Sequence, residues 1–169
     1  MKYLRYALIL LACASIGCDD NPNDPSDTPV TFTAALSSAQ EVPPIANAEA
    51  GASGMATIRL TVTRDSSQTI TAATVDFEVT MTGFPAGAAI TIAHIHEAPA
   101  GQDGGIVVNT GLASGQVTLT NGAGSFTRNG VSAQPDVAQR ILDNPGNFYF
   151  NVHSVLNPGG VIRAQLVRQ

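Results

Sequence analysis

The sequence predicts an all-β fold, a two-sheet antiparallel sandwich of the immunoglobulin-like or Greek-key type with one short helix near residues 135–143. Apolar and polar residues alternate with a period of two along most of the chain after residue 30, as in the segment from Thr57 to Val62. Valine and threonine are abundant, and turns rich in Gly, Pro, Asn or Ser separate the alternating runs. Because alternation leaves each strand with one apolar face, we expect two sheets that bury those faces against each other.

Nine runs of this kind are expected to form the strands. Each is rich in β-branched and apolar residues and ends near a turn-forming residue. Their close spacing along the chain favours antiparallel neighbours. The expected strands cover residues 30–37, 54–64, 70–82, 89–96, 105–109, 115–120, 123–127, 147–153 and 160–167.

One helix interrupts this pattern. Pro135 suits the first helical turn, and Asp136 favours the positive end of a helix. An apolar stripe runs from Val137 to Leu142, and the Asn-Pro-Gly segment at 144–146 ends the helix. We expect a structural role for this helix, in which it closes one end of the sandwich.

The first 17 residues resemble the signal peptide of a bacterial lipoprotein. Lys2 and Arg5 precede an uncharged apolar run that is too short to span a bilayer. The residues around Cys18 resemble a lipobox, with Ser15 in the place where that motif usually carries Leu. We therefore expect cleavage before Cys18 and lipidation of Cys18. No disulfide is expected, since the other cysteine lies in the removed segment.

Residues 18–30 are expected to form a disordered tether between the membrane and a folded domain at 31–169. The tether consists mostly of acidic residues, Pro and Asn and has too few apolar residues to order itself. Export and lipid anchorage place the protein in the bacterial cell envelope. The sequence leaves open which membrane holds it.

The charge excludes nucleic acid as a partner. The chain has 8 basic and 13 acidic residues, a net charge of −5, and removal of Lys2 and Arg5 changes this to 6 − 13 = −7. No lysine follows position 2, so the domain has no basic surface for a phosphate backbone. The expected partners are the membrane, through the lipid, and an extracellular or periplasmic protein.

All three histidines lie in two segments that each combine a strand with a Gly/Pro-rich turn. His94 and His96 are two residues apart on an expected strand and therefore project from the same face. Asn151 and His153 share a face in the same way, together with Tyr149. If these strands lie side by side or face one another, the three imidazoles meet.

Two interpretations of the histidines remain open. Three imidazoles with a fourth open position form a ligand set for zinc or copper. Glu97, Asp103 or Asn109 could then supply the fourth ligand or orient a ring. In the other interpretation, which we prefer from the sequence, the side chains clamp Gly-rich loops by bonding backbone carbonyls. Rings that meet at one point favour the metal, and rings that point at separate carbonyls favour the clamp.

Two further residues are candidates for a structural role. Glu41 precedes two prolines that force an extended path, so we expect its carboxylate to bond backbone groups there, with partner binding as the alternative. The place of Arg163 in its motif indicates partial burial or a role at the site. By its strand position Arg163 is expected to project outward and to pair with Asp76, Glu78 or Glu97.

Four segments together resemble the CHRD (chordin) domain family. They are Leu36 to Pro44 with the two glycines that follow at 51 and 54, His94 to Val107, Phe148 to Ser154, and Pro158 to Leu166. The third is similar to the family's Y-x-N-x-H-T pattern and the fourth to its closing G-E-I-R-G-Q-[IL]. The departures are Ser154 for Thr, Val161 for Glu and Ala164 for Gly, and none removes a histidine. The resemblance implies a secreted β-domain and names no reaction.

The expected function is a non-catalytic binding or structural module of the cell envelope. The domain has no thiol nucleophile, no G-x-S-x-G elbow and no P-loop. The first alternative is a copper- or zinc-binding domain that uses His94, His96 and His153. The second is a metal-dependent enzyme.

Overall fold

The structure, a computed structural model, describes residues 28–169, which form an all-β domain with one α-helix. The expected signal peptide, Cys18 and most of the expected tether lie outside the described residues. In chain order the elements are β1 (Val30–Ser37), η1 (Ser38–Gln40), β2 (Ser53–Arg64), β3 (Ile70–Thr82), β4 (Ile90–Glu97), β5 (Gly105–Asn109), β6 (Gly124–Ala133), α1 (Pro135–Asp143), η2 (Pro145–Asn147), β7 (Phe148–Ser154), β8 (Ile162–Gln165) and β9 (Val167–Arg168).

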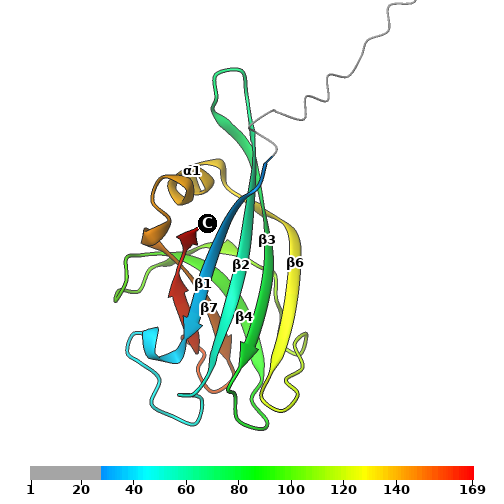
Figure 1. Cartoon of the computed structure of the whole chain (residues 1–169), viewed down its shortest axis with the longest axis vertical. Coiled ribbons are helices and arrows are strands. Elements are labelled where there is room, and N and C mark those ends of the chain that lie inside the picture. The colour runs from blue at the N-terminus through cyan, green and yellow to red at the C-terminus, as the bar shows by residue number, and fades with distance from the viewer. Residues whose placement is uncertain (1–27) are drawn as a thin grey trace, which may run out of the picture.

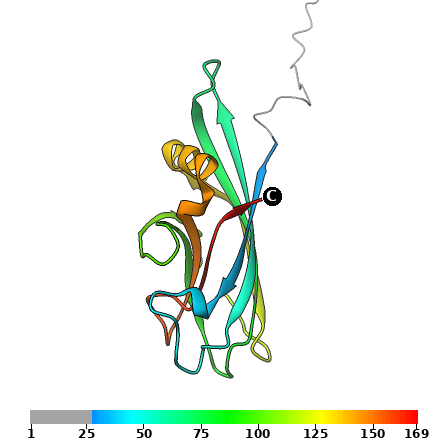
Figure 2. The same cartoon turned by 60° about the vertical axis from the view of Figure 1, so that its left-hand side comes forward.

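The strands belong to a single antiparallel sheet that is nearly closed into a barrel. The order along the sheet is β5-β4-β7-β8-β1-β2-β3-β6, and β9 also pairs with β1. Figures 1 and 2 show β1, β2, β3 and β6 as one curved wall, with β4 and β7 across the interior from it. The two-sheet sandwich is therefore not confirmed, because β8 and β9 both pair with β1 and join the two expected sheets. Alternation predicts which face a strand buries, but it does not predict the strand's partner.

Three expected strand ranges differ from the structure. Residues 115–120 form no strand, and the only ladder contact there is an isolated bridge between Thr120 and Ala123. Positive φ angles at Gly115 and Gly122 turn the chain on both sides of this segment, which breaks a regular ladder. The expected strand 123–127 continues as β6 to residue 133, and the expected strand 160–167 is divided into β8 and β9.

Helix α1 covers the residues that the sequence predicts, with proline in its first turn. Its buried residues Val137, Ala138 and Ile141 join the hydrophobic core, and the helix packs against β3 and β2. Its exposed face carries Arg140, which donates to the carboxylate of Glu97 on β4. Figure 1 shows the helix beside the upper part of the curved wall.

The core fills the interior between the two sides of the sheet. Phe77 of β3 and Phe150 of β7 come from strands that are not neighbours, yet their ring centroids are 5.6 Å apart. All buried apolar residues among those described lie between Phe32 and Leu166. Residues 31–169 therefore contain a complete hydrophobic core of their own. No helix in the described part of the chain is long and apolar enough to cross a membrane.

Strand β7 is buried on both faces and carries three of the polar residues singled out in the sequence. All seven of its residues are buried. Its apolar residues point into the core, so Tyr149, Asn151 and His153 lie on the opposite face, as their spacing predicts. Two loops cover that face. The loop at 98–104 bonds to Tyr149, and the loop at 155–160 bonds to His153.

Candidate functional site

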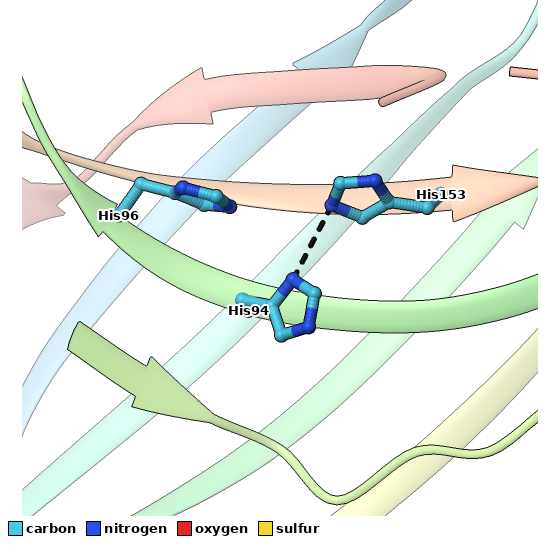
Figure 3. Close-up of side chains that lie close together, drawn as sticks. All are labelled: His94, His96 and His153. Atoms are coloured by element: carbon cyan, nitrogen blue, oxygen red, sulfur yellow. Dashed lines mark hydrogen bonds between the residues drawn. The ribbon is translucent and has the colours of Figure 1, made fainter. Parts of the chain in front are cut away.

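The three histidines meet on the outer face of β4 and β7. These strands pair so that His94 lies opposite Asn151 and His96 lies opposite Tyr149, and His153 follows two residues later on β7. Figure 3 shows the rings of His94 and His96 from β4 close to the ring of His153 from β7. One nitrogen atom from each ring lies within 4.8 Å of the others, and all three residues are buried.

Backbone carbonyls orient two of the rings. His96 Nδ1 lies 2.9 Å from the carbonyl oxygen of Gly104. His153 Nδ1 lies 2.9 Å from the carbonyl oxygen of Pro158. Since a carbonyl oxygen only accepts hydrogen bonds, both Nδ1 atoms donate and both neutral rings keep their lone pair on Nε2. Each Nε2 atom is therefore free to accept a hydrogen bond or to bind a metal.

The lone pairs of these two rings are not fully used within the cluster. His153 Nε2 lies 3.3 Å from His94 Nδ1, and the geometry makes His94 the donor. His96 Nε2 is buried and has no hydrogen-bond partner among the residues that the structure describes. A buried acceptor without a partner costs about 1–3 kcal/mol. The cluster therefore contains a nitrogen atom that would gain from a bound group.

The spacing of the nitrogen atoms is compatible with one shared ion. A tetrahedral zinc ion with bonds of about 2.0–2.1 Å holds its ligand atoms about 3.3–3.4 Å apart. The distance between His94 Nδ1 and His153 Nε2 is 3.3 Å. The His96 ring completes a triangle whose sides are no longer than 4.8 Å. These two atoms thus already have the spacing of ligands, and a bound ion would require the His94 proton to move from Nδ1 to Nε2 so that the Nδ1 lone pair faces the ion.

Burial keeps the three imidazoles neutral. Desolvation, together with the smaller effects of the neighbouring rings of His153 and His96, lowers the pKa of His94 to about 4. Burial also lowers the pKa of His96 and of His153, although the carbonyls that accept from them oppose this effect. All three rings are therefore uncharged at neutral pH, and the neutral form is the one that binds a metal.

A stack of side chains supports the His96 ring. The Tyr149 ring is nearly parallel to it, at an interplanar angle of 5° and a centroid separation of 4.8 Å. The guanidinium carbon of Arg163 lies 3.7 Å from the centroid of the Tyr149 ring on β7. The backbone of Gly104 bonds to both rings, since its N–H donates to the Tyr149 hydroxyl and its carbonyl accepts from His96. These contacts hold the plane of the His96 ring.

Arg163 itself is buried, and its guanidinium donates to Asp103 Oδ1 at 2.8 Å and to the carbonyl oxygen of Gln102 at 2.7 Å. The loop at 98–104 folds over β8 and brings these acceptors to it. The alternation of residues along a strand does not show that a distant loop will bury one of its side chains. The prediction that Arg163 projects outward is therefore wrong, and so are the three partners that we expected for it, Asp76, Glu78 and Glu97.

The three residues expected to supply a fourth ligand or to orient a ring have other partners. Glu97 accepts hydrogen bonds from Arg140. Asp103 pairs with the buried arginine of β8, and the side chain of Asn109 accepts from the backbone N–H of Gly111. None of them bonds to an imidazole ring among the described residues. Backbone carbonyls orient the rings instead, and sequence patterns do not show where carbonyls of distant loops lie.

Glu41 and Asn151 form a second polar cluster on this side of the sheet. Glu41 is only 6% exposed, and both Glu41 Oε1 and Asn151 Oδ1 are buried without a partner in the described part of the chain. A Cβ atom on Gly160 would lie 2.4 Å from Asn151 Nδ2 and 2.8 Å from Glu41 Oε2, so only glycine fits beside them. Burial raises the pKa of Glu41 to about 7, although Arg163 opposes this effect. The predicted bonds from Glu41 to backbone groups are absent from the described residues.

A third polar group, around Glu49, was not predicted. The buried Glu49 carboxylate accepts from Ser154 Oγ and from Asn157 Nδ2, each at 2.5 Å. Asn47 bonds to Asn157 through its side-chain amide. This group ties the loop before β2 to the end of β7. The signal that could have found it is the pair of polar residues Ser154, at the end of β7, and Asn157, in the turn that follows.

Comparison with known proteins identifies one family. A family model described as the CHRD domain matches residues 32–166. The matched range includes the three histidines and the polar groups around Glu41 and Glu49. It confirms the family resemblance predicted from the four sequence segments. No curated protein and no solved structure matches the chain significantly.

Proposed function

Because the chain belongs to the CHRD domain family, we propose that it is a non-catalytic module of the bacterial cell envelope that binds one zinc or copper ion. His94, His96 and His153 supply the ligands for this ion. The family suggests a module without a reaction of its own, and the histidine cluster adds a specific ligand to that description.

The observation that carries the proposal is the convergence of three buried, neutral imidazoles. One nitrogen of each ring lies within 4.8 Å of the others. Internal hydrogen bonds satisfy only part of the cluster and leave His96 Nε2 without a partner within residues 28–169. Zinc and copper both accept imidazole nitrogen as a ligand, and one such ion would engage all three rings.

The carbonyl bonds of His96 and His153 fit a metal site as well as a clamp. A histidine that binds a metal usually donates its other ring N–H to a carbonyl or carboxylate, which fixes its tautomer. A clamp requires only the bond from Nδ1 to the loop. It does not require that nitrogen atoms of the three buried rings lie close to one another. At these two residues the two interpretations are therefore compatible, since Nδ1 holds the loop and Nε2 faces the proposed ion.

The burial of the rings supports a non-catalytic role. His96 is the most exposed of the three, at 8%, and the loops at 98–104 and 155–160 lie over the cluster. A catalytic metal keeps an open coordination position that a substrate can reach. A covered cluster suits a structural or stored ion better than it suits a hydrolase or an oxidoreductase.

The cellular location in this proposal rests on the amino-terminal sequence. A signal peptide over residues 1–17, lipidation of Cys18 and a tether up to residue 30 would hold the domain at a membrane surface. Cys18→Ala should abolish both lipid attachment and recovery in the membrane fraction, measured by mass spectrometry and fractionation. Membrane recovery of an unlipidated Cys18→Ala protein would contradict the anchor.

The metal proposal is tested by elemental mass spectrometry of residues 31–169 after titration with zinc or copper(II). The expected result is close to one ion per chain. The His96→Ala variant should lose this ion because one of three ligands is gone. Asn109→Ala is the matched control. Asn109 is an exposed residue of β5 that lies opposite His94 of β4, and among the described residues its side chain bonds only to the backbone N–H of Gly111. The control should keep the ion.

The proposal fails if the wild-type domain retains no metal after gel filtration. It also fails if His96→Ala binds as much metal as the control does. If the domain holds no metal and His96→Ala is less stable by about 1 kcal/mol, the histidines act only as a clamp.

A further inference from the structure

A cavity of about 430 Å³ lies beside Glu41, outside the histidine cluster. The segment at 41–47, the loop at 156–160 and Asp103 line it. Its volume is within the range of pockets that hold small ligands, about 300–1,000 Å³. We propose that this cavity binds a basic side chain of a partner protein, with its ammonium or guanidinium group against Glu41.

The charge of the cavity favours a cation. Its lining residues include two acids, Glu41 and Asp103, and no basic residue among those that the structure describes. Arg163 lies on the wall of a neighbouring cavity instead and pairs with Asp103. When Glu41 is ionised, two carboxylates and one guanidinium leave a net charge of −1 in this region. A monocation from a partner would neutralise it.

The unpartnered oxygen atoms favour a group that donates hydrogen bonds. Glu41, which lines the cavity, has a buried carboxylate oxygen, Oε1, that lacks a donor among the described residues. The buried Oδ1 atom of Asn151 also lacks a donor there, but Asn151 is not part of the cavity lining. Gly160 keeps the two side chains close, because no larger residue fits between them and the loop. An ammonium group carries three N–H donors and a guanidinium carries five, whereas a hydroxyl carries one. In the free protein a proton can occupy Glu41, whose pKa burial raises to about 7, and the cation would replace it.

The walls suit the aliphatic part of a basic side chain. Apolar residues line both sides of the opening, among them Pro44, Ile45 and Leu156. Leu156 is 54% exposed, although it is large and apolar. Lysine and arginine place their methylene groups on apolar surface and their charge beyond it. A lining that combines these apolar residues with two carboxylates therefore matches such a side chain more closely than it matches a metal ion or an anion.

The partner inferred from this site is a protein with an exposed lysine or arginine. The domain is acidic overall, which would speed the encounter with a basic surface. The inference uses no residue that the metal proposal treats as a ligand. It therefore stands or falls independently of the bound ion, and the test uses metal-free protein.

The test is a titration of ¹⁵N-labelled residues 31–169, followed by NMR. The probes are N-acetyl-arginine amide, N-acetyl-lysine amide and, as the neutral counterpart of arginine, N-acetyl-citrulline amide. The expected result is a saturable shift of the backbone amide signals of Asn157, Gly159 and Gly160 with the two basic probes. The citrulline probe should bind at least about tenfold more weakly, because it lacks the charge.

Two variants assign the binding to the cavity. Glu41→Gln removes the charge and should weaken binding of the basic probes by about tenfold or more. Glu78→Gln makes the same change at an exposed position on β3 and should leave binding unchanged. Ala46→Leu, at the exposed rim, narrows the cavity without a change of charge and should also weaken binding. Since Ala46 is exposed, this variant remains informative if Glu41→Gln folds poorly.

Several results would overturn the inference. The first is a titration with excess basic probe that shifts none of the amide signals of Asn157, Gly159 and Gly160. The second is equal binding of the citrulline and arginine probes. The third is a folded Glu41→Gln variant that binds the basic probes as tightly as the wild type does. Putrescine, a free amine, is the competing probe. Tighter binding of putrescine than of both amino-acid amides would assign the cavity to small amines and overturn its assignment to a partner protein.

Discussion

The two faces of strand β7 are both buried, but for different reasons. On one face Phe148, Phe150 and Val152 pack into the core and need no specific partners. On the other face Tyr149, Asn151 and His153 lie under two loops, and their polar atoms must find partners there. The three buried side-chain atoms without a partner among the described residues all lie on this second side. The first face explains why the chain folds, and the second leaves acceptors that a ligand would satisfy.

The largest effect is expected from the core face. Phe150→Ala removes a fully buried ring that contacts Phe77 across the interior, and should lower the free energy of unfolding by about 3–5 kcal/mol. Urea unfolding at pH 7 measures this change. Ile106→Ala, at an exposed position on β5, is the control and should change stability by less than about 0.5 kcal/mol. Equal effects of the two substitutions would mean that the interior of the barrel is not the source of stability.

On the polar face, Glu41 should make stability depend on pH. Its pKa is about 7 in the folded protein against an ordinary value of 4.5, so the folded state binds more protons between these values. The wild type therefore loses stability as the pH rises from about 4.5 to about 7, and the loss is complete above that range. Glu41→Gln cannot titrate and should gain stability relative to the wild type over the same range, by up to about 3 kcal/mol.

Unfolding curves of both proteins at pH 4.5, 6 and 8 check this prediction, with Glu78→Gln as the exposed counterpart. A difference between Glu41→Gln and the wild type that stays constant with pH would show that the Glu41 carboxyl is solvated in the folded protein.

A somewhat smaller change in the free energy of unfolding is expected when the metal binds. Zinc at 100 times its dissociation constant should raise the free energy of unfolding by about 2.7 kcal/mol, and a chelator should reverse the gain. His153→Ala should show no gain, because the ion loses one of its three ligands. Differential scanning calorimetry with and without zinc measures both proteins. Stabilisation of His153→Ala by zinc to the same extent would place the ion elsewhere on the chain.

The smallest effect is expected away from β7, at the ion pair of Arg140 with Glu97. Both side chains are well exposed, at 44% and 36%, although the guanidinium makes two hydrogen bonds of 3.0 Å to the carboxylate. Arg140→Gln should therefore destabilise the domain by less than about 1 kcal/mol. A loss of several kcal/mol in urea unfolding would indicate that this pair is part of the cover over the site.

Local features of the fold were predictable from the sequence. The period-two pattern identifies most strands, and the Pro135–Asp143 helix begins and ends where its signals lie. The pattern also places His94 with His96, and Asn151 with His153, on common faces. The strand order was not predictable in this way, because the pairing of β1 with β8 and β9 joins residues that are far apart in the chain.

The candidate site was predictable only in part, for the same reason. The meeting of the three histidines depends on the pairing of β4 with β7, which a single sequence does not specify. The burial of Glu41 and Arg163 depends on loops that fold over the outer face of the sheet. Loop conformation follows from tertiary contacts such as the bond between Gly104 and Tyr149, and no local pattern encodes it.

The most direct test of the central claim is X-ray absorption spectroscopy at the zinc edge, on residues 31–169 loaded with one equivalent of zinc. The expected result is a shell with three imidazole nitrogens at about 2.0–2.1 Å, and this shell should be lost in His94→Ala, which lacks one of the three ligands. A shell of oxygen atoms alone, or a spectrum that His94→Ala leaves unchanged, would contradict the claim that the three histidines form a metal site.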